Sequence, residues 1–280
     1  WGRENAQWGN KEFYAKLKAI AAFNADRPDA EKLVFVGVDT VYDRPFAERM
    51  LETMNAQVEA GFGSLDSVRA INGLLLDSAL ERSENSSRYA NILPAVRDVT
   101  DLPGAEDEVF YALWGLFHAS KVTIGGSKPL AYRLNTDGAL EENVAVVLTQ
   151  CISACFNMMP ALALPGPLQG PDGENYTYLP MGLDNPYTAR LRGVDTVMKA
   201  MDERGATALF LPLAEERSPY LEGEKLVKTT GYFGALFSFL EYDGPAGEMA
   251  DAMIFHRSTP PLTPWAGEGY DISQQLGAQE

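Results

Sequence analysis

The chain has 280 residues, of which 46% are hydrophobic and 10% aromatic, so it is long and apolar enough to bury a core and is not a disordered chain. Its 23 Lys and Arg against 39 Asp and Glu give a formal net charge of −16, which argues against nucleic acid and anionic membrane surfaces as partners. No apolar run approaches the roughly 18–20 residues that a membrane-spanning helix needs.

The N-terminal part of the chain predicts a helix followed by a strand. Asn10–Asn24 has apolar residues at helical spacing, with Lys and Glu on the other face. Leu33–Val38 is an uninterrupted apolar run, which is typical of a strand covered on both faces, as in a parallel sheet. Asp39 follows this strand at the position where α/β proteins place their sites, and it is therefore a candidate binding residue.

The next part of the chain, residues 45–122, predicts helices throughout. Four segments show a period near 3.6, and clusters of Gly, Pro, Ser or Asn separate them. They are Phe46–Ala60, Leu65–Arg82, Tyr89–Val99 and Ala105–Ser120. We expect them to form a helical subdomain inserted into an α/β core.

The rest of the chain alternates predicted helices with short apolar strands. Residues 139–150 predict an amphipathic helix, and Cys151–Phe156 a buried strand with Asn157 at its carboxyl end. A long Pro- and Gly-rich loop, Pro160–Pro186, comes next. It precedes a helix over Tyr187–Arg204 with Gly205 as the C′ residue, and two further buried strands, Ala208–Leu213 and Ala252–Phe255.

These elements predict an α/β fold with a mixed or mainly parallel central sheet, flanking helices and the inserted helical subdomain. The expected division is residues 1–44 and 123–264 for the two parts of the α/β core, 45–122 for the insertion and 265–280 for a polar, acidic tail.

The two cysteines, Cys151 and Cys155, are four residues apart and could be metal ligands, a redox pair or core residues. They do not form a C-x-x-C motif, and no second pair completes a zinc site. A disulfide between them would need awkward local geometry. We expect buried free thiols, and we expect neither a metal ion nor another cofactor.

Three stretches carry a resemblance to a known family. They are WGNKEFYAKLKAIAAFNADRPDAEKLVFVGVD (8–39), NTDGALEENVAVVL (135–148) and MADAMIFHRSTPPLTP (249–264). In order and spacing they resemble the erythromycin-esterase-like proteins, which are related to the ChaN and TraB group. The resemblance implies an α/β fold and a cleft at the ends of the strands. It adds Arg133, Asn143 and Arg190 to Asp39 and Asn157 as candidate ligand-binding residues.

The resemblance also implies hydrolysis by two histidine motifs and a glutamate, and here this sequence departs from the family. The Gly-Glu-x-His motif is expected before Trp1. The His-Asn-x-His motif falls on Phe156, Asn157 and Met159, so only the asparagine matches. A phenyl ring and a thioether cannot take up protons near pH 7, as an imidazole does.

The resulting expectation is a non-catalytic relative of these hydrolases, located outside the cytoplasm, that binds a small molecule or a protein partner. Two alternatives stay open: an ester hydrolase completed by sequence before Trp1, and a structural subunit of a larger assembly. The chain has two histidines, His118 and His256, either of which could restore a base. His256 is the better candidate because it ends a predicted core strand.

Overall fold

The computed structural model describes residues 10–28, 31–33, 88–101, 109–115, 118–136, 140, 143–160, 176–180, 182, 190–191, 193–222, 227–228, 242, 244–264 and 269–271. The chain divides into two compact units. One consists of Trp1–Ala21, Trp114–Tyr132 and Ala145–Glu280, and the other of Ala22–Leu113 and Arg133–Val144.

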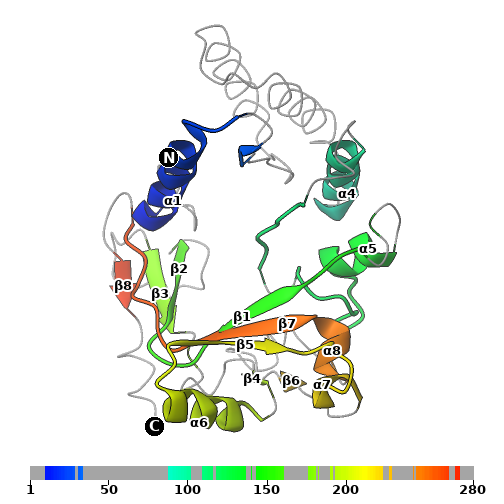
Figure 1. Ribbon diagram of the computed structural model, residues 1–280, viewed down its shortest axis with the longest axis vertical. Coiled ribbons are helices and arrows are strands. Elements are labelled where there is room, and N and C mark those ends of the chain that lie inside the picture. Colours follow the sequence, from blue (N-terminus) through cyan, green and yellow to red (C-terminus); the bar gives the residue numbers. More distant parts are fainter. Residues whose placement is uncertain are drawn as a thin grey trace, which may run out of the picture. The chain divides into compact units, whose positions relative to one another are not determined.

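A three-stranded mixed sheet is the centre of the first unit (Figure 1). Its strands are β1 (Val147–Cys151), β7 (Ala252–His256) and β5 (Ala208–Pro212), in the order β1-β7-β5. The strand β1 runs parallel to β7, and β5 runs antiparallel to it. Together with the helices, this sheet confirms the α/β character of the protein and the expectation that the sheet is mixed.

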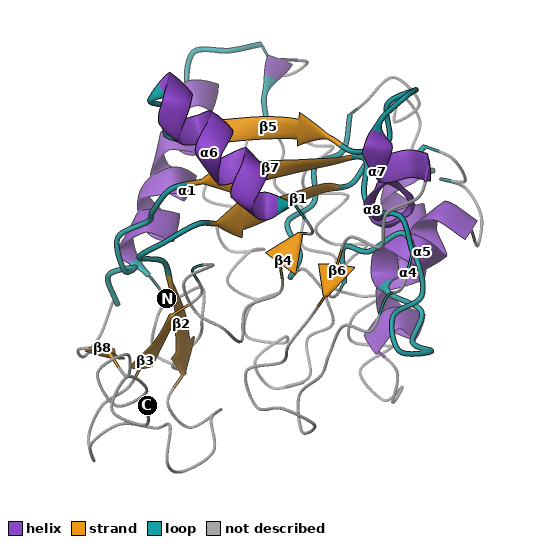
Figure 2. Cartoon of the chain, turned by 90° about the horizontal axis from the view of Figure 1, so that it is seen from below, coloured by secondary structure: helices purple, strands orange, loops and turns teal. Residues whose placement is uncertain are grey.

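The helix α6 (Val194–Arg204) lies across one face of this sheet, beside β5 and β7 (Figures 1 and 2). Its buried side chains are Val194, Val197 and Met201, which have the spacing of one helical face. Gly205 ends the helix in the left-handed conformation with a φ of 59°, which a residue without a Cβ adopts at little cost. The predicted C′ glycine is therefore confirmed.

A second three-stranded sheet belongs to the same unit. It contains β2 (Phe156–Pro160), β3 (Tyr176–Pro180) and β8 (Gly269–Asp271), with β2 antiparallel and β8 parallel to β3. Met158, Tyr176 and Tyr178 form a buried cluster here. The Tyr178 hydroxyl donates a hydrogen bond of 2.7 Å to the carbonyl oxygen of Leu262, which fixes the chain after β7 against this sheet.

The helix α1 (Lys11–Asn24) confirms the predicted N-terminal helix. Asn10 precedes it and is buried, and its side-chain oxygen accepts a hydrogen bond of 2.7 Å from the Phe13 N–H, as an N-cap residue does. The side chain of Glu12 accepts hydrogen bonds from the backbone N–H and the hydroxyl of Thr263. The start of α1 is thus joined to the segment that follows β7.

The remaining described elements are short, apart from one helix of the second unit. They are α4 (Arg88–Thr100), α5 (Leu130–Thr136), α7 (Pro219–Glu222), α8 (Ala246–Met249), β4 (Arg190–Leu191) and β6 (Val227–Lys228). The last two strands pair antiparallel with each other. The position of α4 confirms the helix predicted over Tyr89–Val99.

Two predictions around the cysteines are wrong. The described residues of the predicted helix 139–150, which are 140 and 143–150, are not helical, and β1 begins at Val147. Val147 and Thr149 are exposed and Leu148 is buried, so these residues alternate with the period of a strand. The predicted strand Cys151–Phe156 instead consists of the last residue of β1, a connection over residues 152–155 and the first residue of β2. Asn157 lies within β2 rather than at the end of a core strand.

Other predicted boundaries also differ from the structure. Residues 109–115 are not helical, and Tyr111 in this segment is 93% exposed. The predicted loop Pro160–Pro186 contains β3. The helix predicted from Tyr187 begins only at Val194, after the strand residues of β4.

The strand β5 confirms a predicted position but not its predicted burial, since none of its five residues is buried. The predicted helices Phe46–Ala60 and Leu65–Arg82 lie outside the described residues, as does the predicted strand Leu33–Val38 apart from its first residue. The domain boundaries, including the helical insertion, stay predictions.

Candidate functional site

Two side chains of types that can bind a metal ion or react chemically lie at the carboxyl ends of neighbouring parallel strands. Cys151 is the last residue of β1 and His256 the last of β7, and the two residues are register partners. Because β1 and β7 run in the same direction, both side chains lie at one end of the sheet and on the same face. This end of the sheet is the candidate site.

The connection from β1 to β2 brings the second cysteine to the same place. The N–H groups of Ile152 and Ser153 donate hydrogen bonds of 2.8 Å to the carbonyl oxygens of His256 and Arg257, so the turn is held against the continuation of β7. Ala154 has a φ of 51°, a left-handed conformation that reverses the chain.

Cys151 and Cys155 form a disulfide, which corrects the expectation of free thiols. Their Cα atoms are 6.2 Å apart, a separation that disulfides commonly span. The expectation failed because it assumed one continuous strand, in which both side chains would be on one face but too far apart. In the structure a turn separates the two residues and folds the second sulfur back onto the first.

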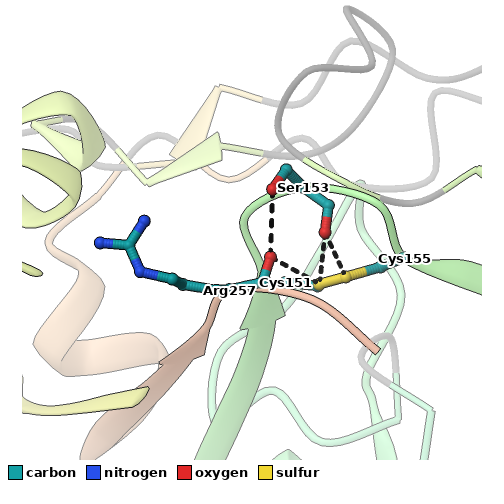
Figure 3. Close-up of a disulfide and its surroundings, with 4 residues drawn as sticks. All are labelled: Cys151, Ser153, Cys155 and Arg257. Carbon is teal, nitrogen blue, oxygen red and sulfur yellow. Dashed lines mark hydrogen bonds between the residues drawn. A yellow bond between two sulfur atoms is a disulfide. The ribbon is translucent and has the colours of Figure 1, made fainter. Parts of the chain in front are cut away.

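Backbone carbonyl groups surround the two buried sulfur atoms (Figure 3). The Ser153 carbonyl oxygen lies 3.6 Å from Cys151 Sγ and 3.2 Å from Cys155 Sγ, and the Arg257 carbonyl oxygen lies 3.7 Å from Cys151 Sγ. A disulfide has no hydrogen to donate. In the dithiol form each S–H group has one hydrogen to donate to one of these carbonyl oxygens.

His256 completes a group of three possible ligands. One donor atom from each of Cys151, Cys155 and His256 lies within 4.8 Å of the others. The Nδ1 atom of His256 is buried and has no hydrogen-bond partner in the described part of the chain. Burial lowers the pKa of His256, so the imidazole is neutral near pH 7 and can act as a ligand or a base.

The side chain of Arg257, the residue after His256, does not face this group. Its guanidinium forms an ion pair with Asp202, and its Nε donates a hydrogen bond of 2.9 Å to the Ala206 carbonyl oxygen. Figure 3 shows the guanidinium pointing away from the two sulfurs. These contacts join the end of β7 to the end of α6. The pKa of His256 is lowered by desolvation of its imidazole.

The five residues predicted to share a cleft lie in several parts of the chain. Arg133 is half-buried in α5, and Asn143 is exposed before β1, both in the second unit. Asn157 and Arg190 belong to different sheets of the first unit, in β2 and β4. Asp39 lies outside the described residues. A site shared by all five stays a prediction.

Sequence reasoning assigned the cysteines to the core and so missed their proximity to a histidine. The available signal was that His256 ends an apolar strand. What the sequence does not display is the parallel pairing of β7 with β1, which brings together residues about a hundred positions apart and makes Cys151 a neighbour of His256.

The opposite end of the sheet has a different feature. The antiparallel strand β5 ends there, and an open hollow of about 310 Å³ follows it. Its lining includes Glu215, Arg217 and Tyr220, and Arg217 has a φ of 70°. Because β5 runs against β7, this hollow is separated from the cysteines by the length of the strands.

No family model, curated protein or solved structure matches the chain. Among the described residues, no helix combines the length and the apolar character needed to cross a membrane.

Proposed function

We propose that this protein is a non-hydrolytic relative of the erythromycin-esterase-like family and that it binds a small molecule rather than cleaving it. The observation that carries the proposal is the packing of Phe156. This side chain, at the first histidine position of the family's second motif, packs against the buried cluster of Met158, Tyr176 and Tyr178.

The packing supports a loss of hydrolysis because this position, although only partly buried, contributes to an apolar cluster. In the antiparallel pair of β2 and β3, Phe156 and Met158 are on the same side of β2. A phenyl ring held there by apolar neighbours neither holds a water molecule nor takes up its proton. Asn157 alone retains the family's residue type, and an amide binds a ligand but does not act as a base near pH 7.

Further parts of the proposal concern partners, compartment and domains. The net charge of −16 favours a cationic or neutral ligand, or a protein partner, over nucleic acid. We infer a location outside the cytoplasm, where disulfides persist, and the Cys151–Cys155 bond supports this. We also infer that residues 45–122 contain a helical subdomain; α4 is the helix described within this range, whereas the described residues 109–115 and 118–122 are not helical.

A second candidate function is favoured by His256. Its imidazole lies at the carboxyl end of the central strand, is half-buried, and has a lowered pKa because of burial. A neutral imidazole at this position could activate water toward an ester. In this case the protein would be a hydrolase with a base outside the family's two histidine motifs.

An esterase assay of the purified chain between pH 6 and 9 distinguishes the two functions. We expect no turnover of an activated ester or of erythromycin above that of a His256→Ala variant. The matched control is His118→Ala, which removes the other histidine. Turnover by the parent and the control that disappears in His256→Ala would overturn the non-hydrolytic proposal, because removal of a general base typically costs about 10²–10⁴ in rate.

The binding part of the proposal is tested with erythromycin as the probe. We expect a saturable increase of the melting temperature, with the intact lactone recovered by mass spectrometry after incubation. At a ligand concentration of about 100 Kd, the stabilisation is about 2.7 kcal/mol. A chain that erythromycin does not stabilise at millimolar concentration would contradict binding of this class of ligand.

A further inference from the structure

We propose that the reduced chain binds a soft divalent cation, represented by Zn²⁺, through Cys151, Cys155 and His256. The proposal does not depend on the family resemblance or on the fate of esters. It rests on the arrangement of the three side chains at the carboxyl ends of β1 and β7.

The geometry brings the three ligands close to the distances of a tetrahedral site. With Zn–S bonds of about 2.3 Å, the two sulfurs of such a site are about 3.7 Å apart, and the imidazole nitrogen is at a similar distance from each. One donor atom of each residue already lies within 4.8 Å of the other two. Small side-chain rotations at Cys151 and Cys155 therefore suffice once the bond between them is broken.

The backbone holds the ligands in place without the cation. Cys151 and His256 are register partners in adjacent strands. The hydrogen bonds of Ile152 and Ser153 to the β7 side fix the turn that carries Cys155. Because the ligands come from paired strands and a bonded turn, little conformational entropy is lost when a cation binds.

The donor types select the class of cation. Two thiolates and one imidazole favour Zn²⁺ and other soft or borderline ions, whereas Mg²⁺ and Ca²⁺ need oxygen ligands. The cysteine spacing, with three residues between the ligands, is common in zinc sites. Three protein ligands leave a fourth position for water or an exogenous ligand, as in catalytic rather than structural zinc sites.

The surroundings of the sulfurs favour a neutralised form over bare thiolates. The carbonyl oxygens of Ser153 and Arg257 face the sulfurs and would repel negative charge on them. A bound dication removes this repulsion. It also gives the imidazole of His256, whose buried Nδ1 has no partner among the described residues, a role for one of its ring nitrogens.

The disulfide and the cation exclude each other. A thiol or phosphine reductant supplies two electrons, which break the S–S bond, and two protons from solvent complete the two thiols; the reductant becomes a disulfide or a phosphine oxide. Binding of Zn²⁺ then releases both thiol protons to solvent and forms two Zn–S bonds. A disulfide reagent that accepts two electrons from the two thiolates re-forms the S–S bond and expels the cation; the reagent becomes two thiols by taking two protons from solvent.

The experiment compares the reduced and the oxidised 280-residue chain. After reduction with a phosphine, which contributes no thiol ligand, the chain is titrated with Co²⁺ as a spectroscopic substitute and then with Zn²⁺. We expect one equivalent of Co²⁺ to bind, with a thiolate-to-cobalt charge-transfer band and the intense visible bands of tetrahedral cobalt. Zn²⁺ should displace it, and the oxidised chain should show neither band.

Three variants assign the ligands. We expect Cys151→Ser and Cys155→Ser to abolish the charge-transfer band or halve it. His256→Gln should weaken Zn²⁺ binding at least about a hundredfold, because even partners of ligands contribute 10–100-fold. The matched control His118→Gln should bind as the parent does. Circular dichroism and the melting temperature show whether each variant is folded, so that a lost fold is not read as a lost ligand.

Either of two results would overturn the proposal. The first is a reduced, folded parent chain that binds no Co²⁺ or Zn²⁺ with a dissociation constant below about 10 μM, a weak limit beside structural zinc sites. The second is a folded His256→Gln variant that binds as tightly as the parent, because the site would then lack its third ligand.

Discussion

Gly247 lies in α8, where a side chain has no room. A Cβ atom at this position would be 2.7 Å from the backbone carbonyl oxygen of Leu213 and 3.1 Å from that of Tyr220. Backbone atoms cannot rotate away as the end of a side chain can. We therefore expect Gly247→Ala to lower the free energy of unfolding by about 1–3 kcal/mol, measured by urea denaturation.

The control for this prediction is Gly115→Ala. The nearest atom to its added Cβ is in the His118 side chain at 3.7 Å, which is an ordinary contact. Its effect should be within about 0.5 kcal/mol of zero, as for most substitutions without steric conflict. Equal destabilisation by both substitutions would show that the contact with Leu213 is not the cause.

Glu12 provides a pH-dependent link between α1 and Thr263. Burial opposes ionisation of this carboxyl group, but the hydrogen bonds from the Thr263 hydroxyl and N–H outweigh it and lower the pKa of Glu12 below 4.5. The pKa is lower in the folded chain, so the stabilisation is present above the unfolded pKa and is lost as the pH falls through the folded pKa. The link therefore weakens below about pH 4.5.

Removal of the hydroxyl tests this link. We expect Thr263→Val to lower the melting temperature near pH 7, and the difference from the parent to shrink as the pH falls from 4.5 toward 2. Thr100→Val is the control, because its hydroxyl bonds a backbone carbonyl group and does not titrate. A constant difference between Thr263→Val and the parent over this range would refute the role of the carboxylate.

At the scale of elements, the disulfide is predicted to stabilise the fold only modestly. It joins residues four positions apart. In the chain-entropy description a closed loop of about five residues contributes about 2 kcal/mol. Since the free energy of unfolding of an ordinary domain is about 5–15 kcal/mol, the reduced chain should remain folded.

Urea denaturation with and without a phosphine reductant measures this difference. The Cys151→Ser variant cannot form this disulfide. Without reductant, its free energy of unfolding should equal that of the reduced parent within error. A reduced chain that is unfolded without denaturant would contradict the estimate. It would also remove the folded state that the proposed cation site requires.

Elements whose pattern is local were predictable from the sequence. The helix α1 follows from its apolar periodicity, and the end of α6 from Gly205, because both signals lie within a few residues. The strands β5 and β7 follow from short apolar runs. Their positions were therefore predicted, although the exposure of β5 was not.

Elements that depend on distant partners were not predictable. Val147–Gln150 fits a helix or a strand by itself, and its pairing with β7 decides the outcome. The turn after Cys151 contains apolar residues whose pattern predicts a strand. Its hydrogen bonds to the carbonyl groups of His256 and Arg257, which are distant in the sequence, hold it in place instead. The candidate site depends on both, so the sequence identified His256 as a strand end but not as a neighbour of the cysteines.

At the scale of the whole molecule, Asp251 connects segments far apart in the chain. Its carboxylate binds Lys121 Nζ at 2.9 Å and accepts a hydrogen bond of 2.6 Å from the Val146 N–H, just before β1. Its carbonyl oxygen accepts hydrogen bonds from the N–H groups of Leu213 and Ala214, just after β5. The residue therefore joins the segments next to all three strands of the first sheet.

We expect Asp251→Ala to lower the free energy of unfolding by about 1.5–3 kcal/mol, because it removes hydrogen bonds to a charged group and leaves Lys121, with a side chain only 19% exposed, without this partner. Glu203→Ala is the matched control. It breaks an ion pair with Lys199 in which both side chains are well exposed, and such pairs contribute about 0–1 kcal/mol. Urea denaturation measures the free energy of unfolding of both variants. A loss of less than about 0.5 kcal/mol for Asp251→Ala, which is typical of an exposed pair, would contradict the prediction.

The central position of β7 in the first sheet has a consequence for folding during synthesis of the protein. Val146 and Asp251, which join at the start of this sheet, are 105 residues apart. On the ribosome, β1 and β5 emerge before β7, the strand that both of them pair with. At a synthesis rate of about 5–20 residues per second, β1 is without this partner for at least several seconds. During that time both strands present unpaired backbone groups, the feature that recruits chaperones and favours aggregation. A nascent chain that ends before Ala252 therefore cannot complete this sheet.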